Sequence, residues 1–246
     1  MPPAETAIDE VRHPPWLYYA AGALALAVLT ITLFGATIAR GHQFAFDRAI
    51  MLAMREPENR RVPEGLVWLK QVMVDVTALG GSTVLTMIVI VTAGFLALRR
   101  HWLTFWLVLG GTISGSWAVG LIKTIVARPR PVLIDHLVEV WSASFPSGHA
   151  ANSAIIYLTV TLLLMQIVES RTARWYMIAV AALLVTMIGV SRVYLGVHWP
   201  SDVLAGWSFG TLWALAWWSL GGWLRLRRLE MGGLAIRPAP SAPVQP

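Results

Sequence analysis

The chain has 246 residues, of which 57% are apolar and only 13% charged. An ordinary soluble domain carries about 25% charged residues, so the composition indicates a membrane protein. Disulfides and thiolate metal sites are excluded because the chain contains no cysteine. The net charge of +6 comes from basic residues scattered over short loops, without a basic strip that carries interleaved aromatic residues. This distribution does not predict binding to nucleic acid.

Six apolar blocks follow one another along the chain, and each approaches the ~20 residues that a helix needs to cross a bilayer. Backbone groups in lipid must be satisfied within their own segment, and barrel strands would alternate in polarity, so these continuous runs predict helices. We therefore predict an all-α fold built on a bundle of six transmembrane helices. The expected spans are residues 16–39, 82–98, 102–125, 149–168, 174–195 and 203–223.

The two ends of the chain are predicted to lie outside the transmembrane domain, which covers residues 16–224. Residues 1–15 carry Glu5, Asp9 and Glu10, and no small-residue cleavage site follows the first apolar run, so that run is expected to be a retained anchor. Residues 225–246 end in a segment rich in proline and alanine, which predicts a disordered tail.

Residues 40–81 separate the first two spans and mix apolar residues at helical spacing with charges. Because Pro57 and Pro63 interrupt the pattern, we expect one or two amphipathic helices at the membrane surface. Asp75 and Thr77 precede the second span, where we expect a capping or turn role; contact with a substrate is the alternative.

Two groups of residues suggest how the helices pack. The small residues of the third span predict close approach of neighbouring backbones and a central place in the bundle. They are Gly110, Gly111, Ser114, Gly115, Ser116 and Gly120. Tryptophans in the second half of the chain are expected to form interfacial belts and lipid-facing surface. They are Trp141, Trp199, Trp207, Trp213, Trp217, Trp218 and Trp223.

Six spans would place both chain ends and the loops 99–101 and 169–174 on one side of the membrane. Those segments are rich in arginine, so the positive-inside rule predicts that this side is cytoplasmic. The opposite side also carries basic residues, but loop 40–81 there is rich in acidic residues as well, and several of the basic residues on that side are candidates for the functional site.

The first polar cluster is KTIVARPRP, in which Lys123 ends the third span and Arg128 and Arg130 follow. A snorkelling lysine with a stop-transfer signal is the alternative interpretation. Pro129 and Pro131 weaken that alternative because they hold the guanidinium groups on a stiff, extended segment.

The second cluster is SASFPSGHAANS, where Ser147 and Gly148 directly precede a helix that starts near His149. Free backbone N–H groups and the positive end of a helix dipole meet at such a point and favour an anion. An ordinary serine or glycine N-cap is the alternative.

The third cluster is SRVYLGVHWPSD, with Arg192 at the end of the fifth span and His198 in the connection to the sixth. Asp202 follows His198 by one helical turn. It can complement the helix dipole, or it can accept the ring N–H of His198 and leave the other nitrogen free to attack.

All three clusters fall on the same face of the predicted bundle. Together they supply cations, a helix N-terminus, two histidines and one orienting carboxylate, which suit an anion of about two charges such as a phosphate monoester.

These clusters resemble the three-part signature of the type 2 phosphatidic acid phosphatase superfamily, membrane lipid phosphatases that share a core with vanadium haloperoxidases. The signature is a lysine, six residues and Arg-Pro; then Pro-Ser-Gly-His; then Ser-Arg, five residues, a histidine, three residues and an aspartate. The matching residues are Lys123, Arg130 and Pro131, then Pro146, Ser147, Gly148 and His149, then Ser191, Arg192, His198 and Asp202.

The resemblance implies a role for each residue. His198 would be the nucleophile that forms a phosphohistidine, with Asp202 holding its ring, and His149 would protonate the leaving oxygen. The phosphoryl oxygens would be held by Lys123, Arg130, Ser147, Gly148 and Arg192. No metal and no cofactor are implied. The family pattern assigns no role to Arg128, and we expect its side chain at the rim of the site, in contact with a second phosphate or a lipid headgroup.

The resemblance further implies an enzyme of the bacterial cytoplasmic membrane that acts on a lipid phosphate or diphosphate at the extracytoplasmic surface. The resemblance to bacterial members favours an isoprenoid carrier diphosphate such as undecaprenyl diphosphate as the substrate, with phosphatidic acid and phosphatidylglycerol phosphate as alternatives. A phosphotransferase would use the same site. A transporter is disfavoured because the charges gather at span ends and not at mid-membrane.

Overall fold

The structure is a computed structural model that describes residues 16–42, 44–56 and 67–235, and the regular elements within these ranges are helices, without a β-strand. The predicted N-terminal segment 1–15 lies outside them. The helices before the site are α1 (Trp16–Ala39), α2 (Ala45–Ala53), α3 (Val67–Ala78), α4 (Ser82–Leu98) and α5 (Trp102–Val126). They are followed by α6 (Gly148–Ser153), the π-helical turn η1 (Ala154–Leu158), α7 (Thr159–Leu164), α8 (Arg171–Tyr194) and α9 (Pro200–Ala235).

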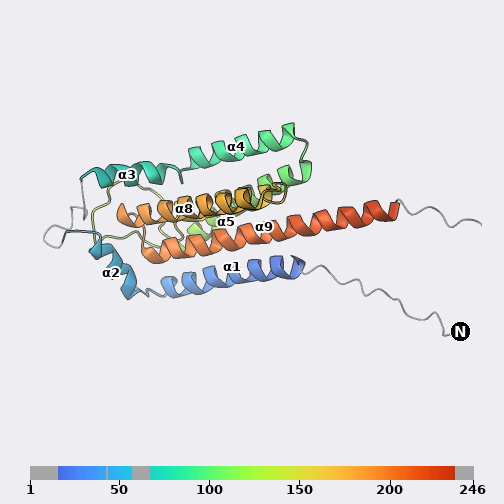
Figure 1. Ribbon diagram of the computed structural model, residues 1–246. Coiled ribbons are helices and arrows are strands. Elements are labelled where there is room, and N and C mark those ends of the chain that lie inside the picture. The colour runs from blue at the N-terminus through green and yellow to red at the C-terminus, as the bar shows by residue number, and fades with distance from the viewer. Residues whose placement is uncertain (1–15, 43, 57–66, 236–246) are drawn as a thin grey trace, which may run out of the picture.

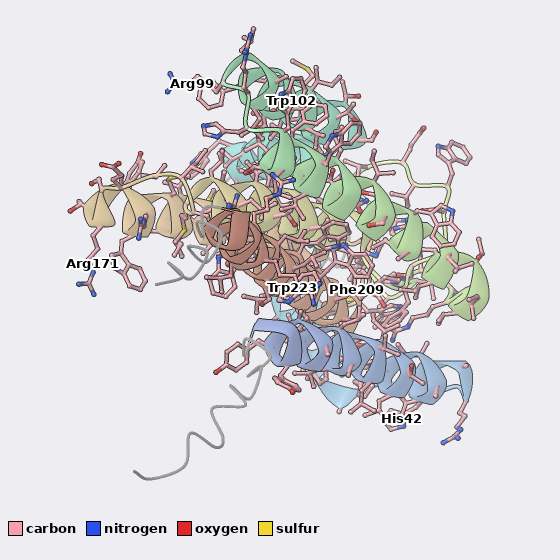
Figure 2. All side chains as sticks on the ribbon, turned by 90° about the vertical axis from the view of Figure 1, so that its right-hand side faces the viewer. His42, Arg99, Trp102, Arg171, Phe209 and Trp223 are labelled. Carbon is pink, nitrogen blue, oxygen red and sulfur yellow. The ribbon has the colours of Figure 1, made fainter. Side chains whose placement is uncertain are left out.

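The long helices run alongside one another as an elongated bundle (Figure 1). α1 packs along α9, α9 also packs on α6 and η1, and α3 packs on α8. The N-terminal end of α1, the α4–α5 turn and the C-terminal end of α9 lie at one end of the bundle (Figure 1). Figure 2 views that end, with Arg99 and Arg171 at its periphery. The small helices α2 and α3 lie at the other end.

All six predicted spans fall on helices, and within the described residues three to four helices have the length and hydropathy to cross a membrane. Three qualify alone, at Tyr18–Ala39, Trp102–Val126 and Arg171–Tyr194. A fourth span would result if α3 and α4, which meet at a bend of 44°, acted as one. The run from Gly148 to Leu164 is apolar but short. α9 is long enough, but its many glycines and tryptophans lower its mean hydropathy.

The end of the last helix corrects one predicted boundary. The disordered tail was expected from residue 225, but α9 continues to Ala235. Exposed Arg227 covers the ring of Trp223 at 4.4 Å and contributes to this extension. Residues 236–246 lie outside the described part of the chain.

The glycines of α5 accommodate tryptophan rings from α9, and not neighbouring backbones as predicted. A Cβ added at Gly115 would lie 2.7 Å from Nε1 of Trp213, and one at Gly110 would lie 2.8 Å from the ring of Trp217. Trp213 Nε1 also donates to the carbonyl of Gly111 at 2.9 Å. These two tryptophans are therefore packing residues of the bundle, whereas Trp141 is 92% exposed.

Close backbone approach occurs instead between α6 and α9. A Cβ at Gly206 would lie 3.0 Å from the carbonyl oxygen of Ser147, and one at Gly210 would lie 2.7 Å from that of Ala151. The spacing of these two glycines matches the small-residue interfaces of membrane helices. This contact sets the start of α6 directly against the first turns of α9.

Candidate active site

The predicted site residues all lie at the bundle end that carries α2 and α3. Four helix termini bring them there: the C-terminal ends of α5 and α8 and the N-terminal ends of α6 and α9. Lys123 is in the last turn of α5, Ser147 precedes α6, Arg192 is in the last turn of α8, and Asp202 is in the first turn of α9. Arg130 and His198 come from the connections between these helices.

The chain turns sharply where it leaves α5. Ala127 ends the helix in the left-handed conformation, with φ of 45°, and its N–H donates to the carbonyl of Lys123 at 3.1 Å. Lys123 points toward the start of α6: its Nζ donates to the carbonyl of Ala143 at 2.7 Å, and its Cε would lie 3.2 Å from a Cβ at Gly148. Gly148 therefore makes room for the lysine as well as for an anion.

The start of α6 offers groups that are free to bind. Ser147 occupies the N-cap position with extended backbone, but its side chain makes no capping hydrogen bond. Its Oγ is buried without a hydrogen bond to any described residue, while its N–H donates to the carbonyl of Asp202 at 3.0 Å. The ordinary N-cap alternative is therefore wrong for this hydroxyl, which remains available to a ligand.

The loop that carries His198 is held on several sides. Arg55 Nη2 donates to the carbonyl of Tyr194 at 2.9 Å, and Arg130 Nη1 donates to that of Val197 at 2.6 Å. Gly196 turns the loop with φ of +78°, and a Cβ there would lie 2.8 Å from the carbonyl oxygen of Asp135. These contacts leave the His198 ring little freedom.

Asp202 contacts the ring of His198 as predicted. Its Oδ2 lies 3.5 Å from His198 Nδ1 and accepts hydrogen bonds from the Ser144 hydroxyl and, at 3.0 Å, from the Trp199 N–H. With Nδ1–H directed at this carboxylate, Nε2 carries the free lone pair. Nε2 lies 3.4 Å from Nη1 of Arg130, the position where a phosphoryl group would meet both.

The pKa of His198 is lowered to about 4, mainly by burial. The hydrogen bond and charge of Asp202 oppose this shift, and the charges of Arg192 and Arg130 add to it. The ring is therefore neutral near pH 7, as a nucleophile must be.

Positive charge dominates the rest of the site. The charges of Arg130 and Arg192 both act on Lys123, and that of Arg130 acts on Arg192. His149, which is half-buried, lies in the field of these three cations and of His198. Such an arrangement favours an anion between the cations.

The α3–α4 turn forms a wall of the site that the motifs do not reveal. Thr77 does not cap α4, whose N-cap is Gly81 without a side-chain hydrogen bond, and Asp75 bonds to Gln71 within α3. Thr77 Oγ1 accepts a hydrogen bond from Arg192 Nη1 at 2.9 Å. A Cβ at Gly80 would lie 3.4 Å from the His149 ring. The capping role is therefore wrong, but the turn role is confirmed, because the carbonyl of Thr77 accepts the N–H of Gly80 at 3.0 Å. The Thr77 hydroxyl orients an arginine of the site.

Arg128 is not at the rim. Its side chain is 6% exposed and forms ion pairs with Asp202 Oδ1 at 2.5 Å and with Asp47 Oδ2 at 3.1 Å. The prediction that it contacts a second phosphate is wrong, because both terminal nitrogens of its guanidinium are paired with buried carboxylates. Asp47 was not predicted. Its spacing of one helical turn from buried Met51 was the available signal that it faces inward.

Fold and site together define a helical membrane protein with a positively charged site built around two histidines. Comparison with known proteins gives the family: the model of the PAP2 superfamily matches residues 104–225. Phosphatidylglycerophosphatase B of Bacillus subtilis (strain 168) is 37% identical over 149 residues, which are 59% of this chain and 71% of that protein. The chain belongs to the PAP2 superfamily.

Other relatives agree with this assignment. An undecaprenyl-diphosphatase of Sulfolobus acidocaldarius is 47% identical over 115 residues, 42% of this chain and 50% of that protein. The crystal structure of a transmembrane PAP2 type phosphatidylglycerolphosphate phosphatase from Bacillus subtilis matches with a TM-score of 0.64 and 28% identity. That match covers 87% of this chain and 97% of the other. The structure of Aquifex aeolicus LpxE, 24% identical with a TM-score of 0.55, shares the fold.

Proposed function

We propose that the protein is an integral membrane phosphatase that removes a phosphate group from a lipid through a phosphohistidine intermediate. The observation that carries this proposal is the placement of His198: Asp202 holds Nδ1, and Nε2 faces the guanidinium of Arg130. A nucleophile beside an anion-binding cation is the arrangement that phosphoryl transfer requires.

The reaction would proceed in two displacements. In the first, the lone pair of His198 Nε2 forms the bond to phosphorus while the phosphorus–oxygen bond to the lipid breaks. His149, which would be protonated only once the negative charge of the bound phosphate offsets the surrounding cations, gives its proton to the leaving oxygen. In the second, His149 takes a proton from a water that attacks the phosphohistidine, the phosphorus–nitrogen bond breaks, and inorganic phosphate leaves.

The cations would stabilise the charge of the transferred group. Lys123, Arg130 and Arg192 surround the expected position of the phosphoryl oxygens, and Ser147 Oγ with the N–H of Gly148 would add hydrogen bonds. These donors supply the charge neutralisation that a divalent metal supplies in other phosphatases, so we propose a metal-independent reaction.

A lipid substrate is supported by the apolar surroundings of the site. A cavity of about 510 Å³ is lined by apolar residues of α1, α5 and α9 and reaches Val126, three residues after Lys123. An acyl or isoprenoid chain could lie there while the phosphate stands among the cations. We propose that the chain crosses the bacterial inner membrane six times and that the site lies at its extracytoplasmic face.

Two substrates are favoured over others. One relative is named a phosphatidylglycerophosphatase, and another is named an undecaprenyl-diphosphatase, the activity that the resemblance to bacterial members favours. Both present a terminal phosphate that the same cations would bind. A lipid phosphotransferase differs in its second step, because an acceptor lipid and not water would take the phosphoryl group.

Phosphate release by the purified protein from a panel of lipid phosphates and diphosphates tests the proposal. We expect release in the presence of chelator, inhibition by vanadate, and a fall of about 10³-fold or more in His198→Ala. His42→Ala is the matched control, because His42 is an exposed histidine at the same end of the bundle. Full activity in His198→Ala would exclude the phosphohistidine, and loss of wild-type activity with chelator would exclude the metal-independent mechanism. Product that depends on an added acceptor lipid, with little free phosphate, would identify a transferase.

A further inference from the structure

Asp47 of α2 is a buried carboxylate at the back of the site. The residue is 1% exposed, and both of its carboxylate oxygens are bonded. Oδ1 accepts the N–H of Ser201 at 2.7 Å, and Oδ2 accepts the hydroxyl of Ser201 at 2.6 Å and Arg128 Nη2 at 3.1 Å. Burying a carboxylate costs several kcal/mol unless it is paired in this way.

Arg128 connects this carboxylate to the one that touches the histidine. Its Nη1 bonds to Asp202 Oδ1 at 2.5 Å and to Ser201 Oγ at 2.8 Å, while its Nη2 bonds to Asp47. The guanidinium also lies over the ring of Trp199, 5.2 Å from its centre. One cation is thus shared between a carboxylate of α2 and a carboxylate of α9.

The sharing decides how much negative charge reaches His198. If Arg128 were paired with Asp202 alone, the two charges would cancel, and the guanidinium would compete with the His198 ring for the carboxylate. Asp47 balances Arg128 from the other side. The set of two carboxylates and one guanidinium then keeps one net negative charge, directed at Nδ1 of His198.

We propose that Asp47 is a positioning residue for His198, which acts by neutralising Arg128 so that Asp202 keeps its charge and its orientation toward the ring. This inference rests on the proposed function, because it takes His198 as the nucleophile. Asp47 itself does not touch the substrate site.

A purely structural role is the competing explanation. Asp47 accepts the N–H of Ser201 in the first turn of α9 and so caps that helix from another element. Asp47→Asn separates the two roles, because asparagine keeps an oxygen acceptor for the Ser201 N–H but removes the charge. Asp75→Asn is the matched control, since Asp75 is an exposed carboxylate of α3 whose Oδ1 accepts a hydrogen bond from Gln71.

The first readout is steady-state phosphate release. We expect Asp47→Asn to lower kcat about 10- to 100-fold, the range found when a group that orients a functional histidine is removed, with KM within about two-fold of wild type. A variant that only loosens the fold would lower the apparent kcat solely through a smaller amount of folded enzyme, together with a lower Tm, so kcat is calculated per folded enzyme and compared at a temperature well below the Tm of each variant. Asp75→Asn should match wild type.

The second readout is the acid limb of the kcat/KM profile, which reports the protonation of free His198. The groups that face His198 are Asp202 from α9, Ser144 and Arg130 from the α5–α6 connection, Arg192 from α8 and His149 from α6. None of these changes in Asp47→Asn. The uncompensated charge of Arg128 should disfavour protonation of His198 and move the limb to lower pH, by on the order of one unit.

The third readout is a double-mutant cycle with Arg128→Gln. Arg128→Gln leaves two uncompensated carboxylates and should move the acid limb to higher pH, whereas Asp47→Asn combined with Arg128→Gln restores one net negative charge and should return it near wild type. The losses of kcat should then be smaller in the pair than the product of the single losses. If Asp47→Asn alone does not fold, the comparison of Arg128→Gln with the pair still reports the charge of Asp47.

The inference is overturned if Asp47→Asn has the kcat and acid limb of Asp75→Asn, if its loss lies in KM alone, or if Arg128→Gln and the pair share one acid limb. These results would leave wild-type activity and its dependence on His198 intact. Failure of the proposed function would look different, as a wild-type protein that releases no phosphate or a His198→Ala variant that remains active.

Discussion

Gly196, two residues before His198, is the position where the smallest change should have the largest effect on the site. In Gly196→Ala the added Cβ would lie 2.8 Å from the carbonyl oxygen of Asp135, 3.2 Å from Arg55 Nη2 and 3.2 Å from Ile134 Cδ1. An ordinary contact between carbon and a carbonyl oxygen is about 3.3 Å or longer, so the loop must move by about 0.5 Å. The left-handed backbone of residue 196 adds about 1–2 kcal/mol for any residue with a Cβ.

The expected result is a loss of both stability and catalysis. Adding the contact to the backbone term gives about 2–4 kcal/mol of destabilisation, typical of strain at a special backbone position. Because a misplacement of about 1 Å can cost about 10²-fold in rate, a shift half as large should lower kcat about 10-fold. Thermal unfolding in detergent and phosphate release at saturating substrate measure the two effects.

Gly41→Ala is the matched control for this prediction. Gly41 has φ of +79° but no atom within 4 Å of an added Cβ, so it carries the backbone cost without the contact and lies away from the nucleophile. We expect it to lose about 1 kcal/mol of stability and no kcat. If Gly196→Ala behaves like Gly41→Ala in both assays, the loop is not held by the contacts described here and the reasoning is refuted.

Two further predictions concern Arg192 and pH. Thr77→Val removes the acceptor of Arg192 Nη1 and should lower kcat/KM about 10-fold, mainly through KM, since a hydrogen bond to a charged group contributes about 1.5 kcal/mol. Thr104→Val is the control: it removes an acceptor of Arg225 at the other end of the bundle and should leave kcat/KM unchanged. Because the pKa of His198 is lowered from 6.5 to about 4, the nucleophile stays neutral and kcat/KM should persist as the pH falls below 6.5 and be lost near pH 4. The same shift favours the folded state above pH 6.5, a contribution that is lost as the pH falls from 6.5 through 4, which unfolding midpoints across this range would measure. An acid limb near pH 6.5, or equal kcat/KM losses in the two threonine variants, would contradict these expectations.

The motif residues could be placed from the sequence because each stands at the end of an apolar run. The apolar pattern locates helix ends, and helices of similar length bring alternate ends to the same face, so Lys123, Ser147 and Asp202 were expected together. The contact of His198 with Asp202 followed from their spacing of one helical turn. Local periodicity is enough for such inferences.

Contacts between distant segments could not be predicted in this way. Arg128 has a charge suited to a substrate, and only the return of α2 against α9 shows that Asp47 occupies it. Trp213 has the residue type of an interfacial belt, but the glycines of α5 give its ring a place inside the bundle. In both cases the sequence specifies the side chain, while its partner depends on how helices far apart in the chain pack.

The short helix α2 carries opposite charges near its two ends, and each meets the helix end that suits it. Asp47 bonds to a free N–H at the start of α9, where the dipole is positive, and Arg55, just beyond α2, bonds to the carbonyl of Tyr194 at the end of α8, where it is negative. Reversing α2 would set the guanidinium against the positive end of α9 and the carboxylate against the negative end of α8. The two charges near the ends of α2 therefore favour one orientation of this helix relative to α8 and α9, in addition to its apolar contacts.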